Sequence, residues 1–298
     1  MICPPRTVFP LCKDKMEIVQ RSAKVMNRLD MPDITSDTIR AMEDMSFFTH
    51  SLIFDDLLIV AQKETNCFVL KTEDGLIVMD AIWPDQRAFD AIVDAVKEVK
   101  WNPDTIQKLV LTHGHVDHTG CGRWFVEQYH VDTYLSKEDE LFWKEHPAKP
   151  DRPETWKDYE ISHFLRDGDT ITLGEKTIYV YSTPGHTPGC LSYLFPVKED
   201  GDIHMAALWG GTTPPWDKDG VNQYLKSLDY FADAAMHKNV DVVLSNHTAI
   251  DNGLERIAYS RKRLSYMPNI YIIGSNGIQK YFQVFRTMSD EILKKSER

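Results

Sequence analysis

A nine-residue segment, T-H-G-H-V-D-H-T-G at 112–120, restricts the fold and the site of this chain more than any other feature. Three of the 11 histidines fall between positions 113 and 118, with an aspartate among them. The segment follows an apolar run at 108–112 that is typical of a buried strand, and it precedes a run at 122–129 that is typical of a helix. We therefore predict that the cluster lies at the C-terminal end of a strand, where α/β folds place their sites.

The residue types in this segment predict a metal site. Side chains two positions apart in an extended segment point the same way, so His113 and His115 can face one centre. Asp117 and His118 follow as the chain turns toward the helix, and can face a neighbouring centre. Imidazole and carboxylate groups suit zinc. The alternative, a group of surface histidines in a turn, needs a chance clustering of a rare residue type.

Two further histidines occupy similar positions. His186 lies in S-T-P-G-H-T-P-G at 182–189, after a strand expected at 177–181, and His247 ends L-S-N-H at 244–247, after a strand expected at 240–244. A single histidine at a strand end is more often an ordinary residue than a ligand, but the cluster at 113–118 still needs partners. Two zinc ions need about three protein ligands each, plus a shared water. The predicted ligand sets are His113, His115 and His186 for one ion, and Asp117, His118 and His247 for the other.

The other histidines lack this strand-end context and are expected to be ordinary residues: His50, His130, His146, His163, His204 and His237.

Hydrophobic periodicity predicts an α/β fold. Strands are expected at 51–61 (interrupted at Asp55-Asp56), 66–71, 76–80, 108–112, 133–135, 170–173, 176–182, 191–195, 203–209 and 240–244. Helices are expected at 85–100, 122–129, 221–235, 254–267 and 277–294. The order repeats strands, helix, strand, helix in two similar halves. This predicts sheets packed face to face with helices outside, an α/β sandwich.

The first 45 residues precede this pattern. Residues 14–29 have the spacing of an amphipathic helix, and 36–45 can add a second one. We predict an N-terminal helical extension at 1–45 and one domain at 46–298. The extension is a candidate cap for the site or a contact between copies in a homo-oligomer.

Composition narrows the class of partner. The formal net charge of −11 repels phosphates, which argues against nucleic-acid and anionic-membrane binding and leaves a small molecule as the expected partner. The five cysteines, at 3, 12, 67, 121 and 190, are odd in number and form no CxxC pair, so no disulfide framework is expected. No apolar run has the length of a signal peptide or a membrane span. These features predict a cytoplasmic protein.

The motifs resemble those of the metallo-β-lactamase superfamily over roughly residues 50–265. They are H-x-H-x-D-H at 113–118, G-H-T-P-G at 185–189, a strand-ending Asp80 and the late His247, in the same order and spacing. The resemblance implies an αββα four-layer sandwich with a two-metal hydrolytic site between its halves. It also implies that Asp80 holds the H-x-H loop and is not itself a ligand.

The segment after the strand at 205–209 indicates a subclass. Many superfamily members carry a metal-bridging aspartate there, whereas this chain has G-G-T-T-P-P at 210–215, with neither a carboxylate nor a cysteine. This is most similar to the third subclass of metallo-β-lactamases, whose second zinc takes Asp, His and His. Serines in that subclass hold the substrate carboxylate, and Gly211 and Thr213 stand in the corresponding segment. Both are candidate substrate-binding positions, although Gly211 has no side chain to donate a hydrogen bond.

These features together predict a zinc-dependent hydrolase. Its metal-bound hydroxide would attack the carbonyl of an amide or lactam, and Asp117 would bind the second zinc and orient the nucleophile. One alternative is a lactone, ester or thioester hydrolase that acts on a metabolite. Another is an iron-dependent redox enzyme, which the superfamily also contains. A non-catalytic binding module is disfavoured because all six ligand positions are intact.

Four tryptophans could wall the cleft or pack in loop cores: Trp83, Trp143, Trp156 and Trp216.

Overall fold

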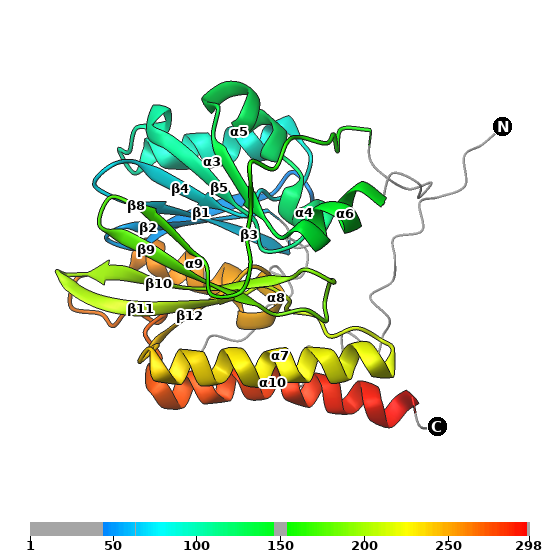
Figure 1. The fold of residues 1–298 in the computed structure, drawn as a ribbon. Coiled ribbons are helices and arrows are strands. Elements are labelled where there is room, and N and C mark those ends of the chain that lie inside the picture. The colour runs from blue at the N-terminus through cyan, green and yellow to red at the C-terminus, as the bar shows by residue number, and fades with distance from the viewer. Residues whose placement is uncertain (1–43, 63, 146–153, 297–298) are drawn as a thin grey trace.

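The structure is a computed structural model that describes residues 44–62, 64–145 and 154–296 (Figure 1). Of the helical extension predicted at 1–45, only Asp44 and Met45 are described. They lie in the coil and turn before the first strand. The role of that extension in capping or oligomerisation therefore lies outside the described residues, and the domain boundary stays a prediction.

Two mixed sheets form the centre of the described structure. The first contains, in spatial order, β1 (Phe48–Phe54), β2 (Leu57–Gln62), β3 (Thr65–Lys71), β4 (Leu76–Met79), β5 (Ile106–Val110), β6 (Asp132–Leu135) and β7 (His163–Phe164). The second contains β12 (Val242–Ser245), β11 (Asp202–Trp209), β10 (Leu191–Glu199), β9 (Lys176–Ser182) and β8 (Thr170–Leu173). Strands β4 to β7 pair in parallel, as do β11 and β12, and the other pairs are antiparallel.

Helices cover the outer face of each sheet. The first sheet carries α3 (Gln86–Glu98) and α5 (Gly122–Tyr129), and the second carries α7 (Lys218–His237) and α10 (Gly274–Ser296) (Figure 1). The remaining helices are α4 (Val116–Thr119), α6 (Lys137–Glu145), α8 (Thr248–Asp251) and α9 (Gly253–Lys262), with a 3₁₀ turn at Pro103–Thr105. One buried cluster lies between the two sheets. A second lies between the first sheet and its helices, and a third between the second sheet and its helices. This is the predicted αββα sandwich.

Burial on both sides of the sheet explains the apolar runs in the sequence. All six residues of β2 are buried. Leu57 and Ile59 belong to the cluster between the sheets, whereas Leu58 and Val60 belong to the cluster under α3 and α5. A strand covered on both faces needs apolar side chains at successive positions, which is why the alternation of a half-exposed strand is missing.

Several element boundaries differ from the prediction. The run at 51–61 is two strands joined at Asp55-Asp56, because the chain reverses there and β1 pairs antiparallel with β2. The Asp56 carboxylate is buried in that turn, where it accepts from Lys176 Nζ at 2.5 Å. The helix predicted at 254–267 ends at Lys262, while α7 and α10 extend beyond their predicted ends. The short elements β7, α4, α6 and α8 were not predicted.

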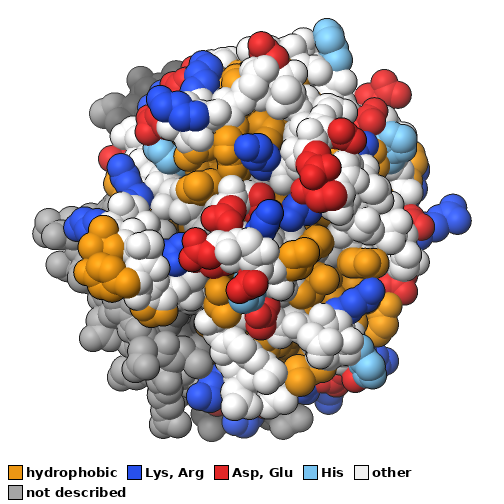
Figure 2. All heavy atoms as spheres, turned by 90° about the vertical axis from the view of Figure 1, so that its left-hand side faces the viewer, with side chains coloured by type: hydrophobic (Ala, Val, Ile, Leu, Met, Phe, Trp, Pro, Cys, Tyr) orange, Lys and Arg blue, Asp and Glu red, His pale blue; other side chains and the backbone are white. Residues whose placement is uncertain are grey.

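Acidic and basic side chains are interspersed on the face of the molecule shown in Figure 2. None of the helices in the described ranges combines the length and apolar character that crossing a bilayer requires.

Candidate metal centre

The predicted ligands converge from the C-terminal ends of three strands. His113, His115, Asp117 and His118 follow β5, His186 follows β9, and His247 follows β12. Residues 113–115 leave the end of β5, and His115 and His247 are the N-cap residues of α4 and α8. An isolated antiparallel bridge between Thr65 and His247 draws the loop after β12 toward the first sheet. Residues far apart in the sequence therefore meet between the two halves of the sandwich.

The first triad consists of His113, His115 and His186. Nε2 of His186 lies 3.1 Å from Nε2 of His113 and 3.1 Å from Nδ1 of His115. Two nitrogens bound at tetrahedral angles to one zinc ion, each about 2.0–2.1 Å from it, lie roughly 3.3–3.4 Å apart. The nitrogens of the first triad therefore have nearly the spacing that a shared ion requires.

The second triad consists of Asp117, His118 and His247. Nε2 of His118 lies 3.1 Å from Nε2 of His247, and Oδ2 of Asp117 lies 3.5 Å and 3.7 Å from these two nitrogens. Within each triad, all three ligand atoms lie within 4.8 Å of one another. The rings of His113 and His118 are 4.1 Å apart, so the two triads are adjacent. The arrangement can accommodate a pair of divalent cations.

Three of the imidazole rings are held by hydrogen bonds from their Nδ1 atoms to the protein. Nδ1 of His118 donates to Oδ2 of Asp80 at 2.8 Å, Nδ1 of His186 donates to the Thr213 carbonyl at 2.7 Å, and Nδ1 of His247 donates to the Glu64 carbonyl at 3.1 Å. Such contacts fix the tautomer and leave the opposite nitrogen free to bind a metal.

Asp80 lies beside the triads, where the sequence predicted it. It is buried at the end of β4 and accepts from the Thr112 backbone N–H at 2.7 Å and from the Thr112 hydroxyl at 2.9 Å, in addition to His118. Its φ of 63° is left-handed, a conformation that aspartate adopts more readily than most residues. Asp80 thereby joins the start of the H-x-H loop to His118.

Charges within the cluster shift the pKa values of the candidate ligands. Burial, together with the neighbouring histidines, lowers the pKa values of His113, His186 and His247 below the ordinary range, so these rings are neutral. Burial opposes ionisation of Asp117, but the neighbouring histidines, His118 foremost, outweigh it and hold the pKa of that carboxyl well below its usual value. Burial likewise opposes charge on His118, but Asp117 and Asp80 outweigh it and raise the pKa of His118.

Gly211 and Thr213, the candidate substrate-binding positions, lie against His186. A Cβ on Gly211 would lie 2.6 Å from Cβ of His186. The Gly211 carbonyl accepts from Trp209 Nε1 and from the Tyr224 hydroxyl, each at 2.6 Å. Both positions thus help to orient His186. Gly211 lets the His186 side chain approach because it has no Cβ, and the Thr213 carbonyl accepts a hydrogen bond from Nδ1 of His186. Their contribution to substrate binding stays a prediction.

The same packing explains the missing carboxylate after β11. A Cβ on Gly210 would lie 1.9 Å from the Leu191 carbonyl oxygen, and one on Gly211 would collide with His186. Neither position can take a bridging aspartate unless Leu191 or His186 moves.

We expect Gly211→Asp to weaken metal binding at the first triad by about tenfold to a hundredfold, the usual effect of disturbing the support of a ligand. Overpacking should also lower the free energy of unfolding by about 1–3 kcal/mol. Gly211→Ala is the matched variant, because it adds the Cβ without the carboxylate and should produce the same loss. Zinc titration of the metal-free proteins measures the metal affinity of both variants, and thermal unfolding measures their stability. Tighter binding by Gly211→Asp than by Gly211→Ala would mean that the segment can supply a bridging ligand.

The four tryptophans were expected either to wall the cleft or to pack in loop cores, and they differ in burial. Trp143 and Trp156 are buried and stacked with ring centroids 6.3 Å apart, so they pack in the core beneath α6. Trp83 is half-buried, and Trp216 is exposed in the loop after Thr213. Of the four, only Trp216 has the exposure expected of a residue that walls an open cleft.

Three residues beside the triads were missed from the sequence. Thr65 donates from Oγ1 to Oδ2 of Asp117 at 3.2 Å, and the Phe142 ring meets the His115 ring edge-on at 5.3 Å. Asp139 bonds to the loops that carry the first triad. Asp139 and Phe142 lie on α6, and the pattern Ser136-x-x-Asp139 is a capping signal that could have located this helix.

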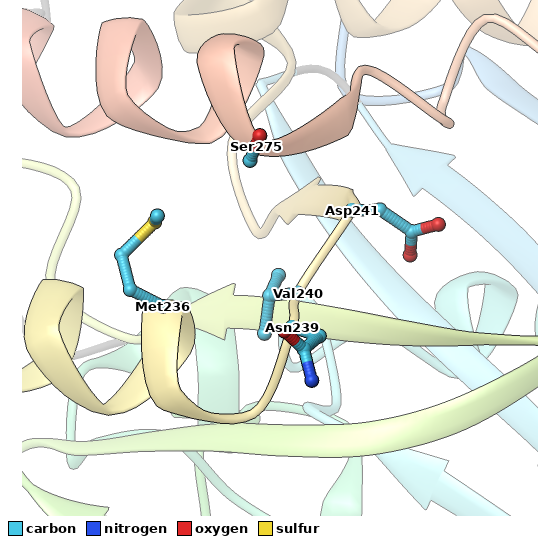
Figure 3. Close-up of a pocket in the computed structure, with 5 residues that line it drawn as sticks. All are labelled: Met236, Asn239, Val240, Asp241 and Ser275. Atoms are coloured by element: carbon cyan, nitrogen blue, oxygen red, sulfur yellow. The ribbon is translucent and has the colours of Figure 1, made fainter.

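A small cavity elsewhere is lined by Met236, Asn239, Val240, Asp241 and Ser275 (Figure 3). It lies where α7 ends and where β12 and α10 begin. His247 follows the opposite end of β12, so that strand separates the cavity from the triads. The Asp241 carboxylate already pairs with His204 at 2.6 Å. The candidate site is therefore the histidine cluster.

Comparison with solved structures shows the fold. A subclass B3 metallo-β-lactamase of Bradyrhizobium japonicum, BJP-1, superposes with a TM-score of 0.71 at 21% identity, covering 86% of this chain and 98% of that one. The FEZ-1 metallo-β-lactamase of Legionella gormanii gives a TM-score of 0.73 at 18% identity, covering 84% and 97%. The predicted resemblance to the third subclass is confirmed at the level of fold.

Comparison of sequences identifies the family. A family model described as the metallo-beta-lactamase superfamily matches residues 61–199. An uncharacterized protein of Aquifex aeolicus is 32% identical over 169 residues, which are 53% of this chain and 72% of that protein. A hydroxyacylglutathione hydrolase of Buchnera aphidicola is 28% identical over 42% of this chain, and the match spans 40% of that enzyme. An uncharacterized protein of Mycobacterium leprae is 30% identical, and the match spans 65% of its length. On its motifs, its fold and these matches, the chain belongs to the metallo-β-lactamase superfamily.

Proposed function

We propose that this protein is a zinc-dependent hydrolase that cleaves the carbonyl–nitrogen bond of a small lactam or amide. The observation that carries the proposal is the pair of adjacent three-ligand groups, five imidazoles and one carboxylate, at the ends of β5, β9 and β12. Three protein ligands per ion leave a coordination position open, as catalytic zinc sites do.

The donor chemistry favours zinc. Imidazole nitrogen and carboxylate oxygen suit that ion, and the neutral state of His113, His186 and His247 leaves their nitrogens available without loss of a proton. When bound, such ions polarise a carbonyl oxygen and lower the pKa of a water molecule to about 7.

The residues of the chain supply orientation and a proton acceptor. Asp117 is ionised because of the histidines around it, and Thr65 fixes its Oδ2 by a hydrogen bond. A carboxylate has two oxygens, so the second one can accept a proton while the first binds a metal. Phe142 packs edge-on against the His115 ring and covers one side of it.

The choice of a lactam or amide rests on the segment after β11. Gly210 and Gly211 leave no room for the bridging carboxylate found in many superfamily hydrolases of esters and thioesters. A thioester is the second candidate substrate, because relatives named hydroxyacylglutathione hydrolase match this chain, including one from Salmonella gallinarum at 31% identity over 46% of the chain.

A substrate panel with metal analysis tests the proposal. The purified protein is assayed for metal content and for hydrolysis of a chromogenic cephalosporin, a lactone and a thioester. We expect zinc to be bound and the cephalosporin to be cleaved, with activity lost to a chelator and restored by Zn²⁺. Because an ion held at 1,000 times its Kd stabilises the native state by about 4 kcal/mol, chelation should also lower the Tm. Cleavage of the thioester alone would favour the second candidate, and bound iron without hydrolysis would contradict both.

A further inference from the structure

We propose that Asp139 is the positioning residue of the first triad: its carboxylate binds the H-x-H loop and the His186 loop at once and sets the distance between them. The inference rests on the proposed function, because it assigns the residue a role in holding a metal-binding geometry.

The carboxylate joins two segments that are otherwise separate in sequence. Oδ2 accepts from the Gly114 backbone N–H at 2.8 Å and from the Thr187 hydroxyl at 2.7 Å, and Oδ1 accepts from the Gly189 backbone N–H at 2.6 Å. Gly114 lies between two ligands of the triad, and Thr187 directly follows the third. One buried side chain therefore contacts both loops that must meet for the triad to form.

The H-x-H loop and the His186 loop lie so close to the start of α6 that Gly114 and Gly189 have no room for a side chain. A Cβ on Gly114 would lie 2.6 Å from the Asp139 carbonyl oxygen, and a Cβ on Gly189 would lie 2.1 Å from Ser136 Oγ. Ser136 in turn accepts from the Asp139 backbone N–H at 3.1 Å, which fixes the first turn of the helix. The two glycines are needed so that both loops can rest on this turn.

An ionised carboxylate is the group that these contacts need. Both oxygens accept, and each of the three partners is a donor. Burial raises the pKa of Asp139, while Thr187, Gly114 and Gly189 oppose the rise by donating to the charged form. In Asp139→Asn, either orientation of the amide directs its NH₂ group at a donor, so at least one of these bonds is lost.

The effect should be confined to one triad. The second triad is oriented by other groups, since His118 is held by Asp80 and His247 by the Glu64 carbonyl. Loss of Asp139 should therefore loosen His113, His115 and His186 relative to one another while the second triad keeps its support.

The test is metal titration of wild type, Asp139→Asn and Glu138→Gln, each prepared metal-free. Glu138 is the matched control, because it is the adjacent residue on α6, is exposed, and loses the same charge. Co²⁺ is titrated by its visible absorption and Zn²⁺ by calorimetry. We expect Asp139→Asn to weaken one of the two sites by about tenfold to a hundredfold and to change its Co²⁺ spectrum. Glu138→Gln should match wild type.

Two further measurements assign the weakened site and guard against misfolding. Asp117→Ala disables the second triad, and His186→Ala disables the first. Added to Asp117→Ala, Asp139→Asn should weaken binding of the remaining ion. Added to His186→Ala, it should have no effect on binding. If Asp139→Asn fails to fold, Thr187→Val removes a single bond to the carboxylate and should give a smaller loss at the same site, which Thr187→Ser restores.

The outcomes separate this inference from the proposed function. If wild type binds two ions but Asp139→Asn and Thr187→Val bind both as wild type does, the positioning role is wrong and the proposed function stands. Equal weakening of both sites would also overturn it, because a general loss of stability would not select one triad. A wild-type chain that binds no divalent ion overturns both proposals.

Discussion

Asp117→Ala is expected to abolish hydrolysis and to leave only one metal ion firmly bound. Oδ2 of Asp117 lies 3.5 Å and 3.7 Å from the two nitrogens of the second triad, and its carboxylate is the one negative charge among the six candidate ligands. Without it, two imidazoles, which carry no negative charge, remain to hold a divalent ion. A catalytic metal contributes several kcal/mol to the transition state, and each 1.4 kcal/mol or so is a factor of ten in rate. We therefore expect kcat/KM to fall by at least about a hundredfold.

Two companion variants separate the charge from the ligand atom. Asp117→Asn keeps an oxygen near His118 and His247 but carries no charge and accepts no proton, so it should retain more metal than Asp117→Ala and still have a low kcat. Asp94→Ala is the control, because Asp94 is an exposed carboxylate on the outer helix α3. Metal content by mass spectrometry and steady-state kinetics give both readouts. Two ions per chain with unchanged kcat/KM in Asp117→Ala would contradict the proposed site.

The six candidate ligands could be found from the sequence because each group follows a strand with a clear apolar run. The strand before His186 was predicted to within one residue at each end, since β9 spans Lys176–Ser182. The strand before His247 was predicted at 240–244 and found at Val242–Ser245, a small error that does not change which residue follows its end. Such an error matters little, because a shift of one or two residues in a strand's bounds leaves the following loop at the same end of that strand.

The residues that hold the candidate ligands in place could not be predicted in the same way. Asp139 lies on α6, whose apolar residues Leu141 to Trp143 are consecutive and show no helical period. Its partners Gly114 and Gly189 are 25 and 50 residues away, and no local pattern pairs positions so distant. Gly211 was considered a lost side chain, whereas the structure gives it a packing role that depends on the approach of His186. Contacts of this kind exist only after the two halves have met.

Asp80→Asn is expected to destabilise the protein and weaken the second triad together. Asp80 is buried, and its two oxygens accept from the Thr112 N–H, the Thr112 hydroxyl and His118 Nδ1. Asparagine tolerates the left-handed backbone at this position, but its NH₂ group must face one of these donors. A buried donor left unpaired costs about 1–3 kcal/mol, and a ligand without its support binds metal about tenfold to a hundredfold less tightly.

The losses of stability and of metal affinity should depend on which residue replaces Asp80. Asp80→Ala removes every acceptor and adds about 1–2 kcal/mol for an alanine in a left-handed conformation, so it should be the less stable variant. Asp74→Asn, in the exposed turn between β3 and β4, is the control and should match wild type. Thermal unfolding of the metal-free proteins measures the structural part, at about 2–4 °C of Tm per kcal/mol, and zinc titration measures the other. Because Asp80 bonds directly to His118, the loss of affinity should be larger at the second triad than at the first. A stable Asp80→Asn with wild-type affinity at both sites would show that His118 keeps its orientation without this carboxylate.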